Sequence, residues 1–356
     1  MLDLPEFPWD RLTPYADRAR AHPGGIVDLS VGTPVDPTPS VAQSALYDAA
    51  DAPGYPLTAG TPELREAITA WLARRLGVEA GAVLPTIGSK ELVALLPTLL
   101  GLRGRVLFPD LAYPTYDIGA RLAGCEPVPV RTTDGLIDVE ALDPEGAAAL
   151  WVNHPANPHG RMAPPEHLAE VVAWGRAHRV LVLSDECYAE FGWTAKATSA
   201  LAEGSDGVLA VHSLSKRSNL AGYRAAFVAG DAEVVERLLE VRRHAGLIVP
   251  FPVQAAMVAA LGDDEHVEAQ RARYMERRDV LMPALGKAGW RVDHSDGGLY
   301  LWATRGDDCW AAVGWFADRG ILVAPGEFYG APGAQHVRLA LTAPTDRVTA
   351  AAARLE

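Results

Sequence analysis

Short apolar runs alternate with amphipathic segments over most of the chain. The runs are brief and rich in β-branched or other apolar residues, and they cover 106–108, 148–152, 180–183, 208–211 and 225–228. Runs of this kind are typical of strands that are buried on both faces of a parallel sheet. We therefore expect these five segments to be strands of a buried sheet.

Helical patterns lie between these runs. Residues 61–63, Thr-Pro-Glu, provide a hydroxyl N-cap, a proline at the first helical position and an acid in the first turn, which together favour a helix start. Leucine or isoleucine then recurs at every fourth position from 64 to 76, so one face of this helix is apolar. Residues 166–178 repeat the design between two runs. Alternating strands and helices predict an α/β protein with a mostly parallel sheet.

The pattern changes after about residue 263. Residues 265–287 form a long, charge-rich helical segment, and shorter apolar runs follow it at 299–302, 321–323 and 336–341. We predict a large α/β domain at 36–275. A smaller α+β domain is expected to combine 276–356 with the N-terminal residues 1–35.

The longest uncharged stretch, 245–262, is interrupted by Pro250, Pro252 and Gln254. It contains no apolar run long enough to cross a membrane, and it predicts a buried loop that enters a helix. Acidic residues and two prolines occupy the first ten positions, which argues against a signal peptide. We expect a soluble, cytoplasmic protein without a membrane partner.

Composition narrows the function classes. The 356 residues include 32 Lys and Arg against 45 Asp and Glu, a formal net charge of −13, which argues against non-specific binding to nucleic acid. The three cysteines lie far apart and form no C-x-x-C pair. A disulfide framework and a cysteine-type zinc site are therefore not expected. His154, His212 and His244 have no second ligand at a metal-like spacing, so we predict no metal site.

Polar residues follow several of the predicted strands: S-D-E-C-Y at 184–188, H-S-L-S-K at 212–216 and N-H-P-A-N-P-H-G at 153–160. Ligands of open α/β sheets collect at the carboxyl ends of the strands. An acid, a phenol, hydroxyls, a lysine and an amide should therefore meet in one crevice. In addition, G-S-K at 88–90 opens an apolar helix whose backbone amides can hold an anion.

Pyridoxal 5′-phosphate requires this set of groups. Its aldehyde needs a lysine, and its ring nitrogen needs a carboxylate to stay protonated. Its phosphate is suited to hydroxyls, an arginine and a helix N-terminus. We therefore expect pyridoxal 5′-phosphate as the cofactor.

The motifs and their order resemble the class I and II aminotransferases, which are pyridoxal-phosphate enzymes of fold type I. The resemblance rests on S-L-S-K-R-S-N-L-A-G-Y-R at 213–224, N-P-H-G at 157–160, S-D-E-C-Y at 184–188 and H-V-R-L-A-L at 336–341. It extends from about residue 25 to the C-terminus. It implies a seven-stranded, mostly parallel sheet in the large domain, amino-acid and 2-oxo acid substrates, and a homodimer with shared active sites.

The resemblance also implies a role for each matching residue. Lys216 should bond covalently to the cofactor and then shuttle a proton, while Asp185 should hold the ring nitrogen. Tyr188 should bond the ring oxygen, together with Asn157. The remaining matches are Ser213, Ser215, Arg224, Gly88, Ser89 and Lys90 for the phosphate, Tyr113 for stacking on the ring, Tyr55 for the phosphate of the neighbouring subunit, and Arg338 with the backbone of Gly32 for the substrate α-carboxylate.

Further segments, such as L-P-E-F-P-W-D at 4–10 and R-R-H-A-G-L-I-V-P at 242–250, are similar to actinobacterial N-succinyldiaminopimelate aminotransferases. This similarity implies transfer of an amino group between N-succinyl-LL-2,6-diaminopimelate and 2-oxoglutarate in lysine biosynthesis. Arg242, Arg243 and His244 are candidates for binding the distal part of that substrate.

Other functions stay open at this point. An aspartate- or aromatic-type aminotransferase, or a C–S β-lyase, would use the same motifs. A ligand-sensing regulator with an aminotransferase-like domain is disfavoured because the enzyme pattern begins almost at once, without a winged-helix segment. A nicotinamide enzyme is disfavoured because no G-x-G-x-x-G follows an early strand.

Overall fold

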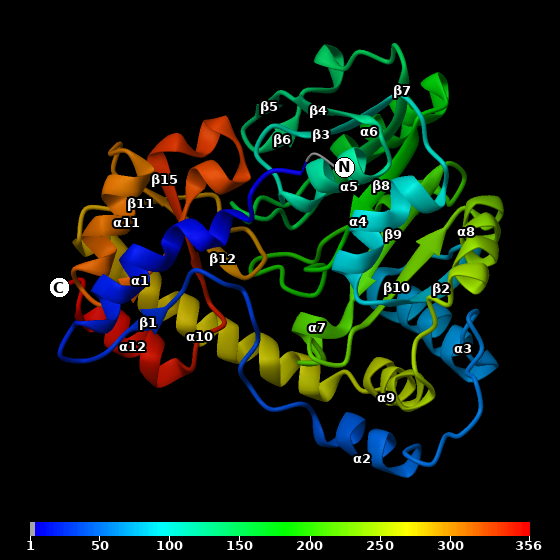
Figure 1. Cartoon of the computed structure of the whole chain (residues 1–356), viewed down its shortest axis with the longest axis horizontal. Helices are drawn as coiled ribbons and strands as arrows, with labels where there is room; N and C mark the ends of the chain where they lie inside the picture. Colours follow the sequence, from blue (N-terminus) through cyan, green and yellow to red (C-terminus); the bar gives the residue numbers. More distant parts are fainter. Residues whose placement is uncertain (1–3) are drawn as a thin grey trace.

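The structure, a computed structural model, describes residues 4–356. A seven-stranded sheet lies at the centre of its larger part (Figure 1), in the order β2-β10-β9-β8-β7-β3-β4. Strand β10 is antiparallel to both of its neighbours, while the remaining pairs are parallel. The predicted α/β class with a mostly parallel seven-stranded sheet is therefore confirmed. The strands are β2 (Ala82–Ile87), β3 (Arg105–Pro109), β4 (Glu126–Val130), β7 (Ala147–Asn153), β8 (Leu181–Asp185), β9 (Val208–Ser213) and β10 (Ala225–Gly230).

Helices cover both faces of this sheet. Helices α3, α6 and α9 pack on one face and α4, α5 and α8 on the other, each group enclosing its own apolar core. The apolar repeat predicted from 64 onward lies on the buried side of α3, where Leu64 and Ile68 have no exposed surface. The helices are α2 (Ser40–Asp48), α3 (Pro62–Trp71), α4 (Ser89–Leu99), α5 (Thr115–Leu122), α6 (Pro165–His178), α7 (Leu214–Arg217), α8 (Ala232–Ala245) and α9 (Phe251–Gly262).

All five predicted sheet strands are present, as β3 and β7 to β10, but the pattern did not predict β2 and β4. Pro85 interrupts β2, and Pro127 and Pro129 interrupt β4. Both strands lie at the edges of the sheet, where a residue without an N–H group is tolerated because one side of the strand has no partner. The prolines explain why the sequence pattern did not predict β2 and β4, and they are compatible with the edge positions of these strands.

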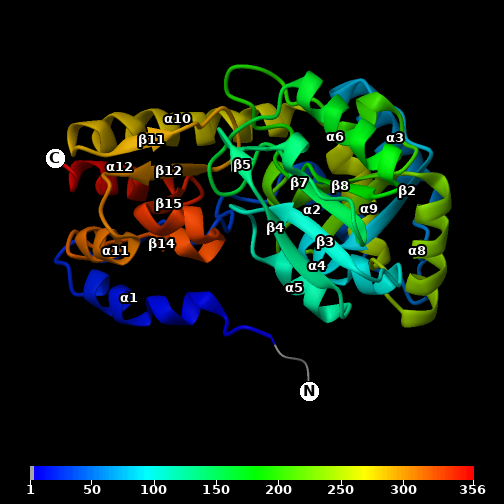
Figure 2. The same ribbon diagram turned by 90° about the horizontal axis from the view of Figure 1, so that it is seen from above.

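The smaller part is built on a four-stranded sheet, β11-β12-β15-β14, with a core of its own. The N-terminal segment joins it, because β1 pairs in parallel with β13, and α1 lies beside α11 (Figure 2). The elements are α1 (Thr13–Arg20), β1 (Val27–Asp28), α10 (Glu265–Lys287), β11 (Arg291–Asp293), β12 (Tyr300–Thr304), α11 (Cys309–Ala317), β13 (Ile321–Leu322), β14 (Ala324–Pro325), β15 (His336–Ala340) and α12 (Thr345–Ala353), and a separate hairpin in the larger part consists of β5 (Thr132–Thr133) and β6 (Leu136–Ile137).

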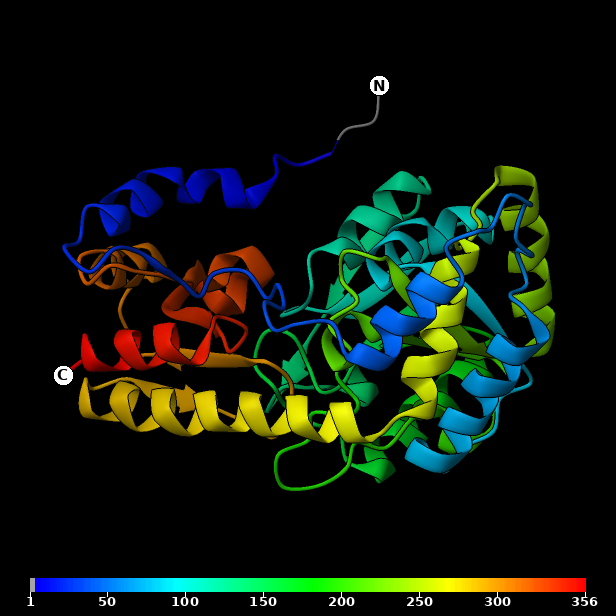
Figure 3. The ribbon, with the colours of Figure 1, turned by 90° about the horizontal axis from the view of Figure 1, so that it is seen from below.

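Helix α10 connects the two parts. Its N-terminal end lies next to α9, and its C-terminal half lies along the smaller part (Figure 3). The proposed domain boundary at 275/276 falls inside this helix, so the two parts share one continuous element. None of the helices in the described range 4–356 is long and apolar enough to cross a membrane.

Candidate active site

A cavity of about 1720 Å³ is lined by residues from both parts of the molecule. Its volume exceeds the ~300–1,000 Å³ that is usual for small-molecule sites. Asp185 and Ser213, at the carboxyl ends of β8 and β9, lie on one side, and Tyr300 and Arg338 of the smaller part also line it. The predicted site residues that line the cavity are Gly32, Ser89, Lys90, Tyr113, Asn157, Asp185, Tyr188, Ser213, Ser215, Lys216, Arg224 and Arg338.

Asp185 is a buried carboxylate at the end of β8. The Tyr116 hydroxyl donates to it over 2.8 Å, and the backbone N–H of Cys187 donates over 3.2 Å. Burial raises the pKa of Asp185, and these two hydrogen bonds lower it in part. Since both donors are neutral, a cation that entered the cavity would stabilise the ionised form.

Lys216 projects from α7 into the cavity. Its Nζ donates to the carbonyl oxygen of Gly32. Burial lowers the pKa of Lys216. Tyr300 and Cys187 oppose this shift, while Arg338 and Arg224 add to it. A lysine with a lowered pKa holds a larger fraction of neutral amine, which can act as a nucleophile or a base.

Arg224 and the start of α4 form a cradle. The guanidinium of Arg224 packs so closely on Gly88 that a β-carbon there would lie 2.2 Å from its Nη2. Gly88 also has a φ of +78°, which favours glycine. The first backbone amides of α4, at Ser89 and Lys90, follow directly, so this position suits an anion.

Arg338 extends from β15 and is almost completely buried. One amino group of its guanidinium donates to Asn157 Oδ1 over 3.0 Å and the other to the carbonyl oxygen of Ser30 over 2.7 Å. Its planar face lies 3.9 Å from the ring centre of Tyr300. The hydroxyls of Tyr300 and Tyr188 are 3.0 Å apart. Arg338 is therefore held rigidly inside the cavity.

The motifs did not predict three features of the site. Tyr116 belongs to the same A-Y-P-T-Y segment as Tyr113, and its position one helical turn after Tyr113 was the available signal. Tyr300, which contacts both Tyr188 and Arg338, had no motif of its own. An aromatic wall formed by Trp9, Phe328 and Tyr329 also lines the cavity, and the residues that build it come from opposite ends of the chain.

Some candidates lie elsewhere. Gly88 contacts Arg224 but does not itself line the cavity, and Tyr55 is 99% exposed. Arg242 is completely buried in an ion pair with Glu91, with an N–O distance of 2.9 Å. Neither Arg242, Arg243 nor His244 lines the cavity, so within the described chain these residues do not form the distal part of the site. The charged sequence R-R-H reflects the end of helix α8, where cations complement the helix dipole.

The residues present fit pyridoxal 5′-phosphate. Asp185 has no cationic partner among residues 4–356, which suits a protonated ring nitrogen. The Nε of Arg338 is buried without a hydrogen-bond partner in the same range, so the guanidinium retains a donor. The cradle of Arg224, Gly88 and the start of α4 suits a phosphate.

Comparison with known proteins agrees with this chemistry. Residues 25–355 match the family described as aminotransferase class I and II. A probable aminotransferase of Mycobacterium tuberculosis, Rv1178, is 59% identical over 362 residues, covering 99% of this chain and 85% of the relative. The 4-dedimethylamino-4-oxo-anhydrotetracycline transaminase OxyQ of Streptomyces rimosus is 57% identical over 364 residues, covering 100% of both chains. The structure of a probable N-succinyldiaminopimelate aminotransferase from Thermus thermophilus has a TM-score of 0.89 at 30% identity, covering 98% of this chain and 99% of that one.

Proposed function

Because this chain belongs to the class I and II aminotransferases, we propose that it transfers an amino group between N-succinyl-LL-2,6-diaminopimelate and 2-oxoglutarate. Enzymes of this family depend on pyridoxal 5′-phosphate. The bound cofactor supplies an electron sink for the charge that develops when the substrate Cα loses a proton. The proposed place of the reaction is lysine biosynthesis.

The residues of the cavity divide the work. Lys216 is proposed to hold the cofactor and, through its Nζ, to remove and return the substrate proton. Asp185 is proposed to keep the ring nitrogen protonated. Tyr188 and Asn157 are proposed to donate to the ring oxygen, and Ser213, Ser215 and Arg224, with the amides at the start of α4, to hold the phosphate.

The observation that carries the substrate proposal is the size of the cavity, about 1720 Å³, together with two cationic side chains, Arg338 and Lys90, in its lining. Arg338 lies among the residues proposed to surround the ring and can bind an α-carboxylate bidentately. The side chain of Lys90 also lines the cavity, and its ammonium lies 5.7 Å from the Phe7 ring centre. Lys90 has no ion pair among the described residues. A long donor with a carboxylate at its far end would use both cations.

A second candidate is transamination of a bulky cyclic ketone. The wall formed by Trp9, Phe328 and Tyr329 is aromatic, and such a surface suits a flat ring system. The full-length similarity to the tetracycline-type transaminase supports this alternative. Removal of the charge of Lys90 should slow the reaction for the first candidate and should have little effect for the second.

A stopped-flow half-reaction series tests the proposal. We expect the succinylated donor to convert the bound cofactor to its amine form faster than alanine, aspartate or tyrosine does. Lys90→Gln should lower kcat/KM for the succinylated donor roughly tenfold, because one charged contact is lost, and should leave alanine unaffected. Lys196→Gln, which changes an exposed lysine outside the cavity, is the matched control. If aspartate or tyrosine reacts faster, the family assignment stands and the substrate proposal fails.

A further inference from the structure

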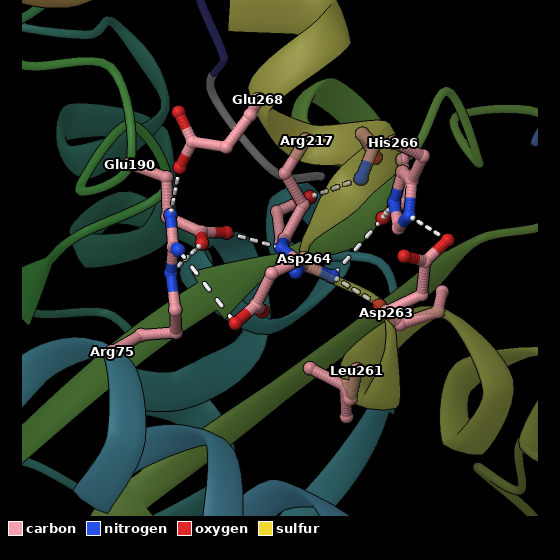
Figure 4. A network of polar contacts seen from close by, with 12 residues as sticks. Arg75, Glu190, Arg217, Leu261, Asp263, Asp264, His266 and Glu268 are labelled. Carbon is pink, nitrogen blue, oxygen red and sulfur yellow. Dashed lines mark hydrogen bonds and ion pairs between the residues drawn. The ribbon is translucent and has the colours of Figure 1, made fainter.

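Figure 4 shows a network of ion pairs that includes Arg75, Glu190 and Arg217. These residues do not line the cavity. The centre of the network is the pair of Arg217 and Glu190. Arg217 follows Lys216 directly in α7, and Glu190 follows Tyr188 by two residues. The network therefore contacts both chain segments that present the proposed lysine and phenol to the cofactor.

The contacts are direct. The Nε of Arg217 donates to one carboxylate oxygen of Glu190, and its Nη1 donates to the Ala260 carbonyl oxygen over 3.0 Å. The other carboxylate oxygen of Glu190 accepts from Arg75 Nε over 2.9 Å. Arg75 also donates to Glu268 over 2.8 Å. Figure 4 shows Arg75 and Arg217 directed toward Glu190 from opposite sides.

These contacts connect α7 to the helix that links the two parts of the molecule. Ala260 lies near the end of α9, and Glu268 lies in the first turn of α10. Farther along α10, Arg277 binds Asp36 over 2.6 Å and also donates to the Leu341 carbonyl oxygen over 3.3 Å. The backbone position next to Lys216 is thus tied to the helix on which the smaller part is built.

The buried ion pair of Arg217 and Glu190 is not explained by stability alone. The side chains of Arg217 and Glu190 are each only 5% exposed, and a buried ion pair is often no more stable than a well-packed apolar pair. What such a pair does provide is fixed geometry, because a planar guanidinium bonds a carboxylate in few orientations. This restraint acts on the residue that follows Lys216.

We propose that Arg217 is a positioning residue: with Glu190 and the α9–α10 junction, it fixes α7 so that the amine of Lys216 faces the cofactor. The position of Lys216 then depends on the placement of α10 relative to the sheet. This inference rests on the role proposed for Lys216 and not on the identity of the donor. It assigns a function to a residue that does not touch the cavity.

The test replaces both charges of the pair, in Arg217→Met/Glu190→Leu. Arg75 loses one acceptor in this variant but keeps Glu268 and Asp264 as partners. We expect the holoenzyme to fold and to retain its cofactor content. The visible circular dichroism of the bound cofactor, which reports its orientation, should fall at least about twofold. With an amino donor, kcat should fall about tenfold or more with little change in KM, and the isotope effect of an α-deuterated donor should rise, because proton transfer becomes slower than the other steps.

Arg74→Met is the matched control, because Arg74 binds Asp264 at the same junction but makes no hydrogen bond or ion pair with Arg217 or Glu190. It should leave the dichroism and the isotope effect unchanged. Wild-type dichroism and kcat in a folded double variant would overturn the proposal. If the double variant does not fold, Arg217→Lys tests the proposal instead, because lysine keeps the charge but loses the planar contact. We expect the same losses of dichroism and kcat in this variant. Wild-type values would refute the proposal. The dichroism needs no substrate, so its outcome is independent of the substrate proposal.

Discussion

The ionisation of the Asp185 carboxyl group depends on what the cavity binds. This group is buried, its pKa is raised by that burial, and its two hydrogen-bond donors, Tyr116 and Cys187, are neutral. Glu186, the next residue, points to the other side of the sheet, where Ser184, Ser199 and the backbone of Ala200 donate to it. The carboxyl groups of Asp185, the last residue of β8, and of Glu186, which follows it, therefore lie in separate environments, as the alternation of side chains in an extended chain predicts.

Asp185→Ala should impair the enzyme far more than Asp185→Glu. The alanine variant removes the charge that stabilises a protonated ring nitrogen, and a charge-assisted hydrogen bond is worth ~1.5–3 kcal/mol, which corresponds to roughly 10- to 150-fold. The half-reaction rate and the dissociation constant of the cofactor measure this loss. Rates near those of the wild type in the alanine variant would show that Asp185 has another role.

A buried pair of histidines predicts how stability depends on pH. Burial lowers the pKa of His154 to about 4 and that of His212 to about 3. In the unfolded chain both histidines titrate near 6.5. Between these values the unfolded state binds more protons, so stability is present above pH 6.5 and is lost as the pH falls toward 4.

His154→Gln should reduce this loss. Its urea midpoint should fall less than that of the wild type between pH 7 and pH 5, by an amount that corresponds to about 2 kcal/mol. The cofactor-free protein is the form to measure, because bound cofactor adds its own pH dependence. Glu186→Gln is a useful comparison, since burial raises the pKa of Glu186 to about 7 and its contribution has the opposite sign. Parallel curves for wild type and His154→Gln would contradict the assignment.

Among the elements, helix α4 has a glycine with positive φ on either side, at Gly88 and at Gly101. Only at Gly88 would a β-carbon collide with another residue. Gly88 precedes the first turn of the helix with a φ of +78° and a side chain of Arg224 in the way of any β-carbon. Gly101, just after the helix, has a similar φ of +64°, but a β-carbon there would meet no atom within 4 Å. Substitution of Gly101 therefore tests backbone strain alone, whereas substitution of Gly88 tests backbone strain together with displacement of Arg224.

We expect Gly88→Ala to weaken cofactor binding at least tenfold, because Arg224 must move away from the proposed phosphate site. Gly101→Ala should lower the free energy of unfolding by about 1–3 kcal/mol through backbone strain alone and should leave the cofactor dissociation constant unchanged. Fluorescence titration of the cofactor-free variants measures both constants. Equal cofactor affinities in the two variants would show that Arg224 does not bind the phosphate.

At the scale of the whole molecule, the role predicted for Tyr55 is not fulfilled within its own chain. Tyr55 is 99% exposed and Leu57 is 57% exposed, while Tyr55 makes no contact with its own cavity. The Tyr55 side chain is therefore free to contact another subunit. This supports the proposal of a homodimer in which Tyr55 reaches the partner's phosphate.

Hybrid dimers test the shared site. Sedimentation should show a dimer, and we expect its interface, as an obligate one, to bury more than ~2,000 Å². Tyr55→Phe should weaken cofactor binding, and Lys216→Ala should abolish turnover. In mixtures of these two variants, a hybrid dimer has one site with both defects and one site with neither, so activity should return on mixing. No recovery from exchanged subunits would place Tyr55 outside the active site.

The amino-acid sequence by itself determined the sheet interior and the chemistry at its edge. Apolar runs such as 208–211 became central strands because strands buried on both faces require continuous apolar side chains. Asp185 and Lys216 met in one cavity because the ends of neighbouring strands meet at one edge of a sheet. These are consequences of local pattern and of topology, and both can be read along the chain.

Only the tertiary structure decided which distant residues surround that chemistry. Tyr300 reaches Tyr188 across 112 positions, Arg338 reaches Asn157 across 181, and Arg242 turns toward Glu91 across 151 instead of toward the substrate. Local periodicity reports whether a side chain is buried, but not which side chain lies opposite. The partner depends on how β12 and β15 of the smaller part lie against the larger part, and on how α8 packs beside α4. These arrangements are set by packing of the whole chain.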